Sequence, residues 1–396
     1  MSVDGPQSLA PGIDPFDQIL ARTQRQRRLF TAHWELTYRC NEKCTHCYLD
    51  VFAPHAKVPD ELTTEECLRI VDQMAELGVL NLTLSGGEIL VRRDFFEIAE
   101  YARSKRFLLR LFTNGILITP AVADRIAALH PYSVELSLYS ATPELHDRIT
   151  RVRRSWELTT RAFGLLREHG IRSVMKTPLM RENARELKAL RALANDLGSS
   201  LRYDLTITQK DSGGIDPLKH RLTDDDLLWV MREEMEADKW VQRHYTDESR
   251  TCSITLNGIV IDPYGQVSPC IQVRKNAGNL RTQPLKEIWE TSPVWKEFGS
   301  LTLGALPVCR TCELNSICVR CHGLAMAEDG DIKAPALVNC REALTRRQVL
   351  IEKGRLPADF PIPAHLKAYV NGRVDSSENR KDMVNFIPVD QLSVRL

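Results

Sequence analysis

Short apolar segments alternate with amphipathic helical segments from residue 34 to about residue 239. Each apolar segment has the length of a buried strand, and the stretch after it has the 3.6-residue period of a helix. This alternation is typical of a parallel sheet assembled from βα units. The six predicted strands lie at residues 34–38, 79–84, 108–112, 133–138, 171–176 and 201–207. Six units predict an α/β fold with a partial or open barrel.

The helix after the first strand has recognisable ends. Thr63 and Glu66 have the spacing of a capping box, and Gly78 can end the helix in a left-handed conformation. Cys67 lies on the apolar stripe of this helix together with Ile70. We therefore expect the Cys67 side chain to be part of the core and not to bind a metal.

The residues before the first strand predict an accessory segment. A short helix is expected over residues 14–30, with a basic run at Arg25, Arg27 and Arg28. The simplest interpretation of this run is a solvated helix face, and contact with a substrate is the alternative.

A different pattern occupies the last third of the chain. Short alternating strands flank Asn257-Gly258 and Tyr264-Gly265, two dipeptides typical of hairpin turns, and a loop-rich stretch dense in cysteine follows. Such a stretch buries little apolar surface, so bound metal would supply the missing stability. Residues 355–396 mix proline and charge with few apolar residues, and we expect a C-terminal extension of uncertain order.

Composition narrows the class of protein. The chain has 396 residues, of which 43% are hydrophobic, and its formal net charge is +1. This charge gives no long-range attraction to nucleic acid or to an anionic membrane, so we expect neither as a partner. The sequence has no apolar run near the ~18 to 20 residues of a membrane span and no secretory signal. We therefore expect a cytoplasmic protein, whose eleven cysteines would be reduced and available to metals.

Three cysteines follow the first predicted strand. Cys40, Cys44 and Cys47 stand in the segment CNEKCTHCY. Three thiolates this close can bind three irons of a [4Fe–4S] cluster and leave the fourth iron free for another ligand. A zinc site completed by His46 is the alternative.

This CxxxCxxC spacing after a first strand resembles the defining motif of the radical S-adenosylmethionine superfamily. The resemblance extends over residues 34 to about 210. It implies a partial (β/α)6 barrel and a [4Fe–4S] cluster whose open iron chelates the methionine moiety of S-adenosylmethionine. It also implies one-electron cleavage of the S–C5′ bond, which gives a 5′-deoxyadenosyl radical that abstracts hydrogen from a substrate.

Two further motifs follow the second and third strands. Ser85-Gly86-Gly87-Glu88 resembles the GGE motif of the superfamily. Glycines would let the backbone approach the ligand closely, and the carboxylate suits the ligand's ammonium group. The Thr113-Asn114-Gly115 segment resembles the TNG turn of many members, and we expect it to be architectural.

The resemblance implies three more contacts with S-adenosylmethionine. Ser137, which ends the fourth strand, would bind the ribose, although a buried and satisfied serine is the alternative. Lys176 and Thr177, which end the fifth strand, would contact the carboxylate or the ribose. Tyr48, which follows Cys47, would lie against the adenine region through its backbone or its ring.

Seven further cysteines lie in the last third of the chain. They are Cys252, Cys270, Cys309, Cys312, Cys318, Cys321 and Cys340. Their order, Cys-x12-Gly-x4-Cys and later Cys-x2-Cys-x5-Cys-x2-Cys with a distant cysteine, resembles the SPASM domain of peptide-modifying radical enzymes. In this domain the last two cysteines of the central run are usually separated by three residues, whereas Cys318 and Cys321 are separated by two.

The SPASM resemblance implies two auxiliary iron–sulfur clusters of the [4Fe–4S] type. The ligands of the outer cluster would be Cys309, Cys312, Cys318 and Cys340. The ligands of the inner cluster would be Cys252, Cys270 and Cys321. The usual fourth cysteine between residues 253 and 269 is absent, so the inner cluster would have an open iron or an outside ligand. Two zinc sites are the alternative, since paired CxxC units also bind zinc.

The same resemblance limits the reaction and the partners. Enzymes with this domain pair act mostly on ribosomally made peptides, on sulfatases or on small peptide-derived molecules. Sulfatase-activating members carry aspartate after the cysteine that corresponds to Cys270, where this chain has Ile271. Maturation of a peptide by crosslinking, oxidation, excision or epimerisation is therefore favoured. A small-molecule or sulfatase-modifying enzyme and a non-catalytic zinc-binding α/β scaffold are the alternatives.

The partners and the domain boundaries complete the prediction. An electron donor such as flavodoxin or ferredoxin is expected. Only about 30 residues precede the first strand, so a separate leader-binding protein or the C-terminal extension would recognise a leader peptide. The predicted parts are an N-terminal accessory helix at 1–30, a partial barrel of the radical S-adenosylmethionine type at 31–240, a SPASM domain at 241–354 and a C-terminal extension at 355–396. The general base is not assigned, and Asp204 and Tyr203 are candidates by location.

Overall fold

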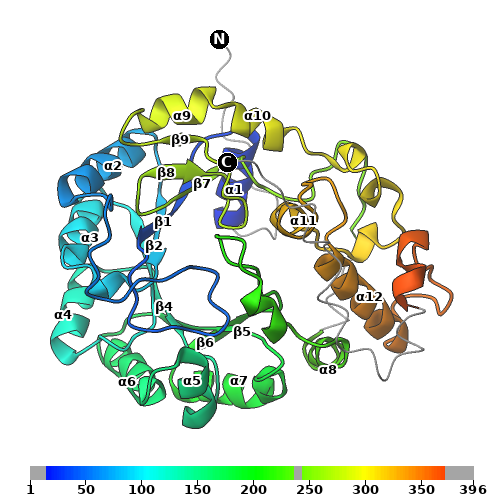
Figure 1. Ribbon diagram of the computed structural model, residues 1–396, viewed down its shortest axis with the longest axis horizontal. Helices are drawn as coiled ribbons and strands as arrows, with labels where there is room; N and C mark the ends of the chain where they lie inside the picture. The colour runs from blue at the N-terminus through cyan, green and yellow to red at the C-terminus, as the bar shows by residue number, and fades with distance from the viewer. Residues whose placement is uncertain (1–14, 236–242, 371–396) are drawn as a thin grey trace.

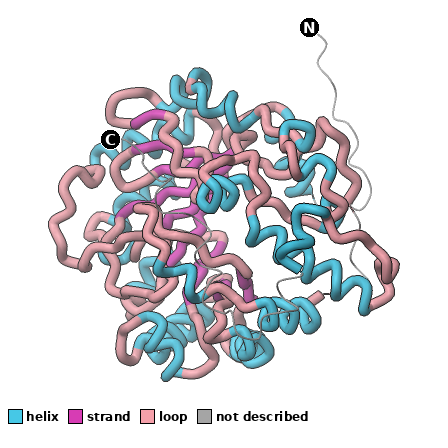
Figure 2. Tube along the Cα trace, turned by 45° about the vertical axis from the view of Figure 1, so that its right-hand side comes forward, coloured by secondary structure: helices cyan, strands magenta, loops and turns pink. Residues whose placement is uncertain are grey.

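A curved sheet surrounded by helices forms the framework of the molecule (Figure 1). The computed structural model describes residues 15–235 and 243–370. Within these residues the sheet has nine strands in the order β6-β5-β4-β3-β2-β1-β7-β8-β9. Every pair from β6 to β7 is parallel, whereas β7–β8 and β8–β9 are antiparallel. Figure 2 shows the strands in the interior with helices around them.

All six predicted strands are present, and their ends are shifted by a few residues. They are β1 (Thr31–Thr37), β2 (Asn81–Gly86), β3 (Leu108–Thr113), β4 (Ser133–Ser137), β5 (Ser173–Pro178) and β6 (Ser200–Asp204). At least one helix follows each strand. These helices are α2 (Thr64–Glu76), α3 (Phe95–Ser104), α4 (Pro120–Ala128), α5 (Pro143–Thr150), α6 (Ser155–Glu168), α7 (Leu187–Asp196) and α8 (Asp224–Glu234). The predicted α/β class with a partial barrel is therefore confirmed.

The two faces of β1 explain why the barrel has an apolar outer layer and a polar interior. Trp34 and Leu36 are fully buried in the core between the sheet and the helices. Side chains alternate along a strand, so His33 and Glu35 point the other way, into the barrel. The barrel interior therefore carries polar and charged groups, which must find partners there.

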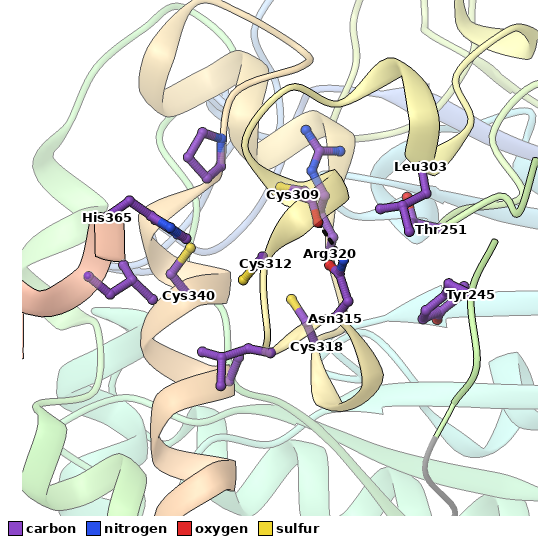
Figure 3. A pocket seen from close by; sticks show the side chains of 14 residues that line it. Tyr245, Thr251, Leu303, Cys309, Cys312, Asn315, Cys318, Arg320, Cys340 and His365 are labelled. Atoms are coloured by element: carbon purple, nitrogen blue, oxygen red, sulfur yellow. Dashed lines mark hydrogen bonds between the residues drawn. The ribbon is translucent and has the colours of Figure 1, made fainter. Parts of the chain in front are cut away.

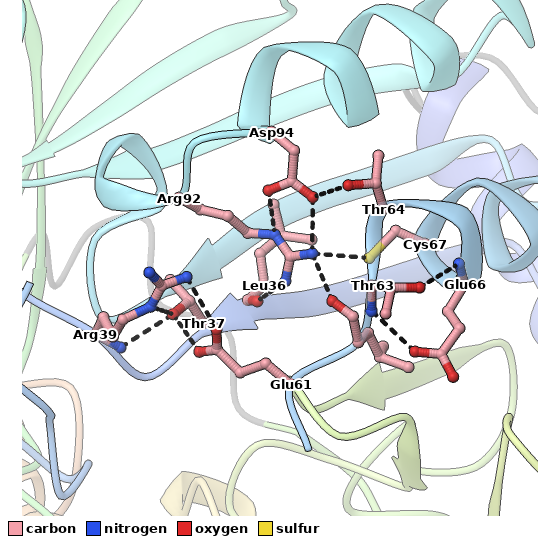
Figure 4. Close-up of polar contacts among 11 residues, drawn as sticks. Leu36, Thr37, Arg39, Glu61, Thr63, Thr64, Glu66, Cys67, Arg92 and Asp94 are labelled. Atoms are coloured by element: carbon pink, nitrogen blue, oxygen red, sulfur yellow. Dashed lines mark hydrogen bonds and ion pairs between the residues drawn. The ribbon is translucent and has the colours of Figure 1, made fainter. Parts of the chain in front are cut away.

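Helix α2 has the predicted ends, and Figure 4 shows the N-terminal one. The Thr63 hydroxyl accepts from the backbone N–H of Glu66 at 3.2 Å, and the Glu66 carboxylate accepts from the N–H of Thr63 at 2.8 Å. Gly78 follows the helix with a φ of +82°. Cys67 is 0% exposed, and the Arg92 guanidinium donates to its sulfur at 3.4 Å. The prediction that Cys67 is a core residue is confirmed.

The N-terminal helix is shorter than predicted. Helix α1 spans Pro15–Arg25, and the chain then turns at Arg27, whose φ is +48°. The predicted helix over 14–30 was wrong at its C-terminal end because Leu29 and Phe30 are buried where the chain enters β1. The Trp289 indole N–H donates to the carbonyl oxygen of Arg27 at 3.3 Å, which fixes this turn against the C-terminal half of the chain.

The strands after residue 250 extend the barrel sheet. They are β7 (Gly258–Ile261), β8 (Gln266–Ser268) and β9 (Gly278–Asn279). Tyr264-Gly265 forms the predicted hairpin turn between β7 and β8. Asn257-Gly258 does not form a hairpin, because the Asn257 carbonyl accepts from the N–H of Thr31 at 3.0 Å and Gly258 begins a strand parallel to β1. A Cβ at Gly258 would lie 2.7 Å from the Thr31 hydroxyl, so glycine here permits close strand pairing.

The described residues of the C-terminal half include four further α-helices, of which α11 and α12 lie to one side of the barrel (Figure 1). They are α9 (Leu285–Thr291), α10 (Pro293–Gly299), α11 (His322–Asp329) and α12 (Leu337–Glu352). Helix α12 is tied to α8 by the ion pairs Arg341–Asp224 and Arg232–Glu352. The predicted boundary between residues 240 and 241 lies outside the described residues. In the part of the chain that the structure covers, no helix has the length and apolar character needed to cross a membrane.

The first part of the C-terminal extension, residues 355–370, is packed. Leu356 and Leu366 are buried in a small core that also contains parts of α12. The Arg347 side chain donates to the carbonyl oxygen of Phe360 at 2.7 Å, and the Tyr369 hydroxyl donates to Asp224 at 2.9 Å. The sequence predicted uncertain order here because the segment has few apolar residues. Those residues nevertheless pack into the small core beside α12 and hold the segment in place.

The end of β2 approaches the cysteine loop at two glycines. The N–H of Gly87 donates to the carbonyl oxygen of Thr37 at 2.8 Å, and the N–H of Glu88 donates to that of Arg39 at 2.9 Å. A Cβ at Gly87 would lie 2.3 Å from the Arg39 oxygen, and one at Gly86 would lie 2.3 Å from the Thr37 oxygen. The glycines therefore allow contact between two backbones, and their predicted approach to a ligand stays a prediction.

We predict that Gly87→Ala destabilises the protein by about 1–3 kcal/mol, because the added methyl group forces the two backbones apart. Urea unfolding followed by circular dichroism measures the change. Gly164→Ala is the matched control, since Gly164 is in α6 with nothing within 4 Å of an added Cβ. The control should be neutral or stabilised by about 0.5–1 kcal/mol. Equal stability of the two variants would contradict the prediction.

We predict that deletion of residues 355–396 lowers the thermal midpoint and exposes the small core beside α12. Each buried leucine side chain contributes about 1.5–3 kcal/mol, and the deletion removes Leu356 and Leu366. Thermal unfolding and binding of a hydrophobic dye measure the effect. A second deletion of 371–396 alone separates the two parts of the extension. If both deletions have the same effect, the packing of 355–370 is not its cause.

Candidate active site

The cysteine loop after β1 is held by neighbouring backbone. The N–H of Cys40 donates to the carbonyl oxygen of Phe52 at 2.9 Å, and the N–H groups of Lys43 and Thr45 donate to the last turn of α5 at 3.1 and 3.0 Å. These bonds fix the loop at both sides. They place Cys40, Cys44 and Cys47 at the carboxyl ends of the parallel strands, where α/β sheets bind their ligands.

The three thiols of this loop lie in one electrostatic environment. Burial raises the pKa of all three, and for Cys44 the charges of Glu42 and Cys47 raise it further. For Cys47 the pKa rises to about 11. Iron binds the deprotonated thiolate form. These buried thiols therefore lose their protons only when the metal supplies a compensating positive charge.

The donor set fits a [4Fe–4S] cluster. In a cubane each thiolate binds a different iron, and Cys40, Cys44 and Cys47 are three thiols of one loop. The His46 ring of the zinc alternative packs edge-on against Tyr139 with 4.6 Å between ring centroids. Burial lowers the pKa of His46 to about 3, so the ring is neutral.

The Glu88 carboxylate joins the ends of β2 and β3. It is 0% exposed and accepts from the Thr113 hydroxyl at 2.8 Å, the N–H of Asn114 at 2.7 Å and the N–H of Leu90 at 2.9 Å. The Asn114 amide donates to Asn41 in the cysteine loop at 2.7 Å. The Thr113-Asn114-Gly115 turn is thus part of the architecture, as expected. Contact between Glu88 and an ammonium group stays a prediction.

The other predicted ligand-binding residues lie on neighbouring strands. Ser85 pairs in register with Glu35 on β1, and Ser137 pairs with Lys176 on β5. The Lys176 ammonium lies 3.6 Å from the Glu135 carboxylate, and the Thr177 hydroxyl donates to the carbonyl oxygen of Leu138, the residue after β4, at 2.6 Å. The structure brings these side chains to one end of the barrel, and their contacts with S-adenosylmethionine stay predictions.

Tyr48 belongs to a buried network that the sequence did not reveal. Its hydroxyl donates to Glu35 at 2.8 Å, and the Arg274 guanidinium donates to the same carboxylate at 2.7 and 2.9 Å. A glutamate inside an apolar strand signals a buried partner. The partner lies 239 residues away, so the sequence could not identify it. The predicted adenine contact of Tyr48 stays a prediction.

Four cysteines line a pocket beside α12 (Figure 3). They are Cys309, Cys312, Cys318 and Cys340. Burial raises the pKa of Cys318 to about 12, and the neighbouring thiols add to the shift. His365 and Leu366 of the extension also line this pocket. The described part of the extension therefore covers the outer cysteine group.

The remaining three cysteines form a second group. Burial raises the pKa of Cys270, and the charges of Cys321 and Cys252 act in the same direction. Cys321 caps α11, where burial raises the pKa of its thiol and the backbone N–H groups of Leu324 and Gly323 oppose the shift. The structure thus brings together the same two groups that the SPASM resemblance implies. Their roles as cluster ligands stay predictions.

Comparison with known families matches both halves of the chain. A model of the radical SAM superfamily matches residues 34–194, and a model of the SPASM iron–sulfur cluster-binding domain matches residues 252–313. The second match ends before Cys318, Cys321 and Cys340. Their grouping with the other cysteines rests on the spacing in the sequence and on the geometry of the structure.

Characterised relatives share about a quarter of their residues with this chain. The AdoMet-dependent heme synthase of Methanosarcina barkeri is 28% identical, over 75% of this chain and 92% of the relative. The mycofactocin maturase MftC of Mycobacterium tuberculosis is 29% identical, over 67% and 71%. The PqqA peptide cyclase of Granulibacter bethesdensis is 27% identical, over 82% and 91%.

Solved structures share the fold. SuiB of Streptococcus suis bound to its precursor peptide SuiA has a TM-score of 0.61 and 15% identity, over 85% of this chain and 82% of that chain. The structure of anSMEcpe with bound AdoMet has a TM-score of 0.60 and 17% identity, over 82% and 97%. The cofactors are S-adenosylmethionine, a [4Fe–4S] cluster and the auxiliary iron–sulfur clusters of the SPASM domain. The chain is therefore an enzyme of the radical SAM superfamily that carries a SPASM domain.

Proposed function

We propose that this enzyme matures a ribosomally synthesised peptide by removing hydrogen from one of its residues. The observation that carries the proposal is the presence of three cysteine groups in one chain, one after β1 and two in the C-terminal half. The relatives named as a mycofactocin maturase and a PqqA peptide cyclase support a peptide substrate. A structural neighbour bound to a precursor peptide supports it as well.

The residues of the barrel have distinct proposed roles. When bound, the cluster and S-adenosylmethionine supply a 5′-deoxyadenosyl radical that abstracts a hydrogen atom. Cys40, Cys44 and Cys47 hold three irons of the cluster and leave one for the methionine moiety. The strand ends around the loop orient that ligand. Its binding residues are proposed to be Tyr48, Ser85, Gly86, Gly87, Glu88, Ser137 and Lys176.

The auxiliary cysteine groups are proposed to serve the second half of the oxidation. A peptide that loses two hydrogens in all would still have one proton and one electron to give up after the first hydrogen atom is abstracted. An auxiliary cluster held by these cysteines would be able to accept that electron. Cys309, Cys312, Cys318 and Cys340 would hold the outer cluster, and the other three cysteines would hold the inner one. Excision and epimerisation use the same first step.

The partners are part of the proposal. A flavodoxin or ferredoxin in the cytoplasm would supply the electron for cleavage, since thiols and clusters persist in a reducing compartment. A separate leader-binding protein would present the peptide.

A small-molecule substrate is the second candidate, and the relative named as a heme synthase favours it. The rate at which 5′-deoxyadenosine forms distinguishes a peptide substrate from a small-molecule substrate. The enzyme would be supplied with a peptide encoded beside its gene, with a mixture of free amino acids or with a tetrapyrrole. Faster formation with the peptide supports peptide maturation. Faster formation with the tetrapyrrole, and none above background with the peptide, favours the second candidate.

We predict that replacing Cys40, Cys44 and Cys47 together by alanine abolishes cleavage of S-adenosylmethionine while the auxiliary clusters stay loaded. The thiolates are the only protein ligands of the cluster, so its loss removes the electron for cleavage. Iron and sulfide analysis of anaerobically reconstituted protein should fall from about twelve to about eight irons per chain. Cleavage is measured by chromatography of deoxyadenosine.

Cys67→Ala is the matched control, because Cys67 is buried in the core away from the loop. The control should keep its full iron content and cleave S-adenosylmethionine. Unchanged cleavage in the triple variant would rule out the mechanism, and zinc without iron in the wild-type protein would rule out the cofactor assignment.

A further inference from the structure

We propose that the buried ion pair between Glu35 and Arg274 is a positioning device for electron transfer. In this proposal the pair sets the placement of the inner cysteine group relative to the Cys40–Cys47 loop. It thereby couples cleavage of S-adenosylmethionine to oxidation of the substrate. The proposal rests on the radical chemistry described above, and it holds for a peptide or a small-molecule substrate.

Glu35 is held in a place where a lone charge would be costly. It lies in the middle of β1, is 0% exposed, and is flanked by the core residues Trp34 and Leu36. Burial raises the pKa of Glu35, but the hydrogen bonds and the charge of Arg274 outweigh it and lower the pKa below its ordinary value. The carboxylate is therefore ionised, and its orientation depends on its partners.

One side of the network leads to the cluster loop. The Tyr48 hydroxyl donates to Glu35 at 2.8 Å, and Tyr48 directly follows Cys47 in the chain. The carbonyl oxygen of Tyr48 accepts from the N–H of Asp211 at 2.9 Å, so both ends of this residue are fixed. A shift of the Glu35 carboxylate would therefore be transmitted to the last cysteine of the loop.

The other side leads to the inner cysteine group. Arg274 follows a tight turn in which the N–H of Val273 donates to the carbonyl oxygen of Cys270 at 2.9 Å. The guanidinium makes two parallel hydrogen bonds with Glu35, at 2.7 and 2.9 Å, and lies 3.2 Å from the Asp211 carboxylate. Two-point contact fixes the direction of a guanidinium as well as its distance. One carboxylate is thus bonded to Tyr48, the neighbour of Cys47, and to Arg274, the residue that follows the Cys270 turn.

A second arginine–glutamate pair joins the same two halves of the chain but lies apart from the three cysteine groups. Arg281 makes two hydrogen bonds with Glu66, at 2.8 and 3.0 Å, and so also joins the C-terminal half to the barrel. This pair lies at the surface, on α2, and neither partner adjoins a cysteine of the three groups. Arg281→Gln is therefore the matched control for loss of an ion pair between the same two halves of the chain.

The test compares Arg274→Gln, Arg274→Lys, Glu35→Gln and Arg281→Gln in anaerobically reconstituted full-length protein. Iron content reports cluster loading. Pulsed electron paramagnetic resonance on dithionite-reduced protein measures the magnetic interaction between the barrel cluster and the inner auxiliary cluster. Deoxyadenosine formed with dithionite alone reports cleavage. The ratio of product to deoxyadenosine reports coupling with whichever substrate accelerates cleavage.

We expect Arg274→Gln to keep its iron and to cleave S-adenosylmethionine within about 2-fold of the wild-type rate, but with a weaker or broader magnetic interaction. The ratio of product to deoxyadenosine should fall about 10-fold or more, since small misplacements have effects of this size. Glu35→Gln should show the same changes as Arg274→Gln in the magnetic interaction and in the ratio of product to deoxyadenosine. Arg274→Lys, which keeps the charge but not the paired geometry, should fall between Arg274→Gln and the wild type. Arg281→Gln should match the wild type in all four measurements.

A wild-type magnetic interaction and ratio in iron-loaded Arg274→Gln would overturn the proposal, and so would an equal loss in Arg281→Gln. If Arg274→Gln loses iron, Arg274→Lys decides in its place: a wild-type interaction in that variant overturns the proposal, and a weaker one supports it. The magnetic measurement needs only loaded clusters and no substrate. If the wild-type enzyme formed no deoxyadenosine, that result would count against the proposed function. The magnetic comparison of the variants would still test this inference.

Discussion

The contact between the end of β2 and the start of the cysteine loop is the constraint on which the rest of the site depends. Main-chain hydrogen bonds from Gly87 and Glu88 to the segment Thr37–Arg39 require a separation that a side chain at Gly87 would prevent. With this contact formed, the Glu88 carboxylate reaches the turn after β3, and that turn reaches Asn41 in the loop. Three strand ends and the cysteine loop are thereby fixed as one unit before any ligand binds.

Inside the barrel, charges are arranged around buried carboxylates. Glu135 is 0% exposed on its side chain and has Arg110 at 3.4 Å and both Lys176 and Arg202 at 3.6 Å. Glu35 has Arg274, whose own charge is shared with Asp211. These two buried carboxylates are compensated by cations from other strands or from the C-terminal half, so the polar interior holds the barrel in one arrangement. Apolar packing outside the sheet supplies most of the stability, and the interior supplies the geometry.

Local patterns in the sequence were sufficient for the strands, the capping box of α2 and the burial of Cys67, because each depends on neighbours within a few residues. They failed where a distant partner decides the structure. Asn257-Gly258 has the composition of a hairpin turn, yet pairing with Thr31 makes it the start of a strand. The extension after residue 354 has few apolar residues, yet the core beside α12 uses them. The partner of Glu35 is likewise set by the tertiary fold, which no local signal encodes.

The parallel pairing of β1 with β7 has a consequence for how the two halves of the chain can move. β1 carries the cysteine loop and lies between β2 of the barrel and β7 of the C-terminal half, with hydrogen-bonded neighbours on both edges. Separation of the two halves would break that ladder in the middle of a continuous sheet. Hinge opening at this place would therefore cost main-chain hydrogen bonds, and we expect β1 and β7 to move together as one rigid body.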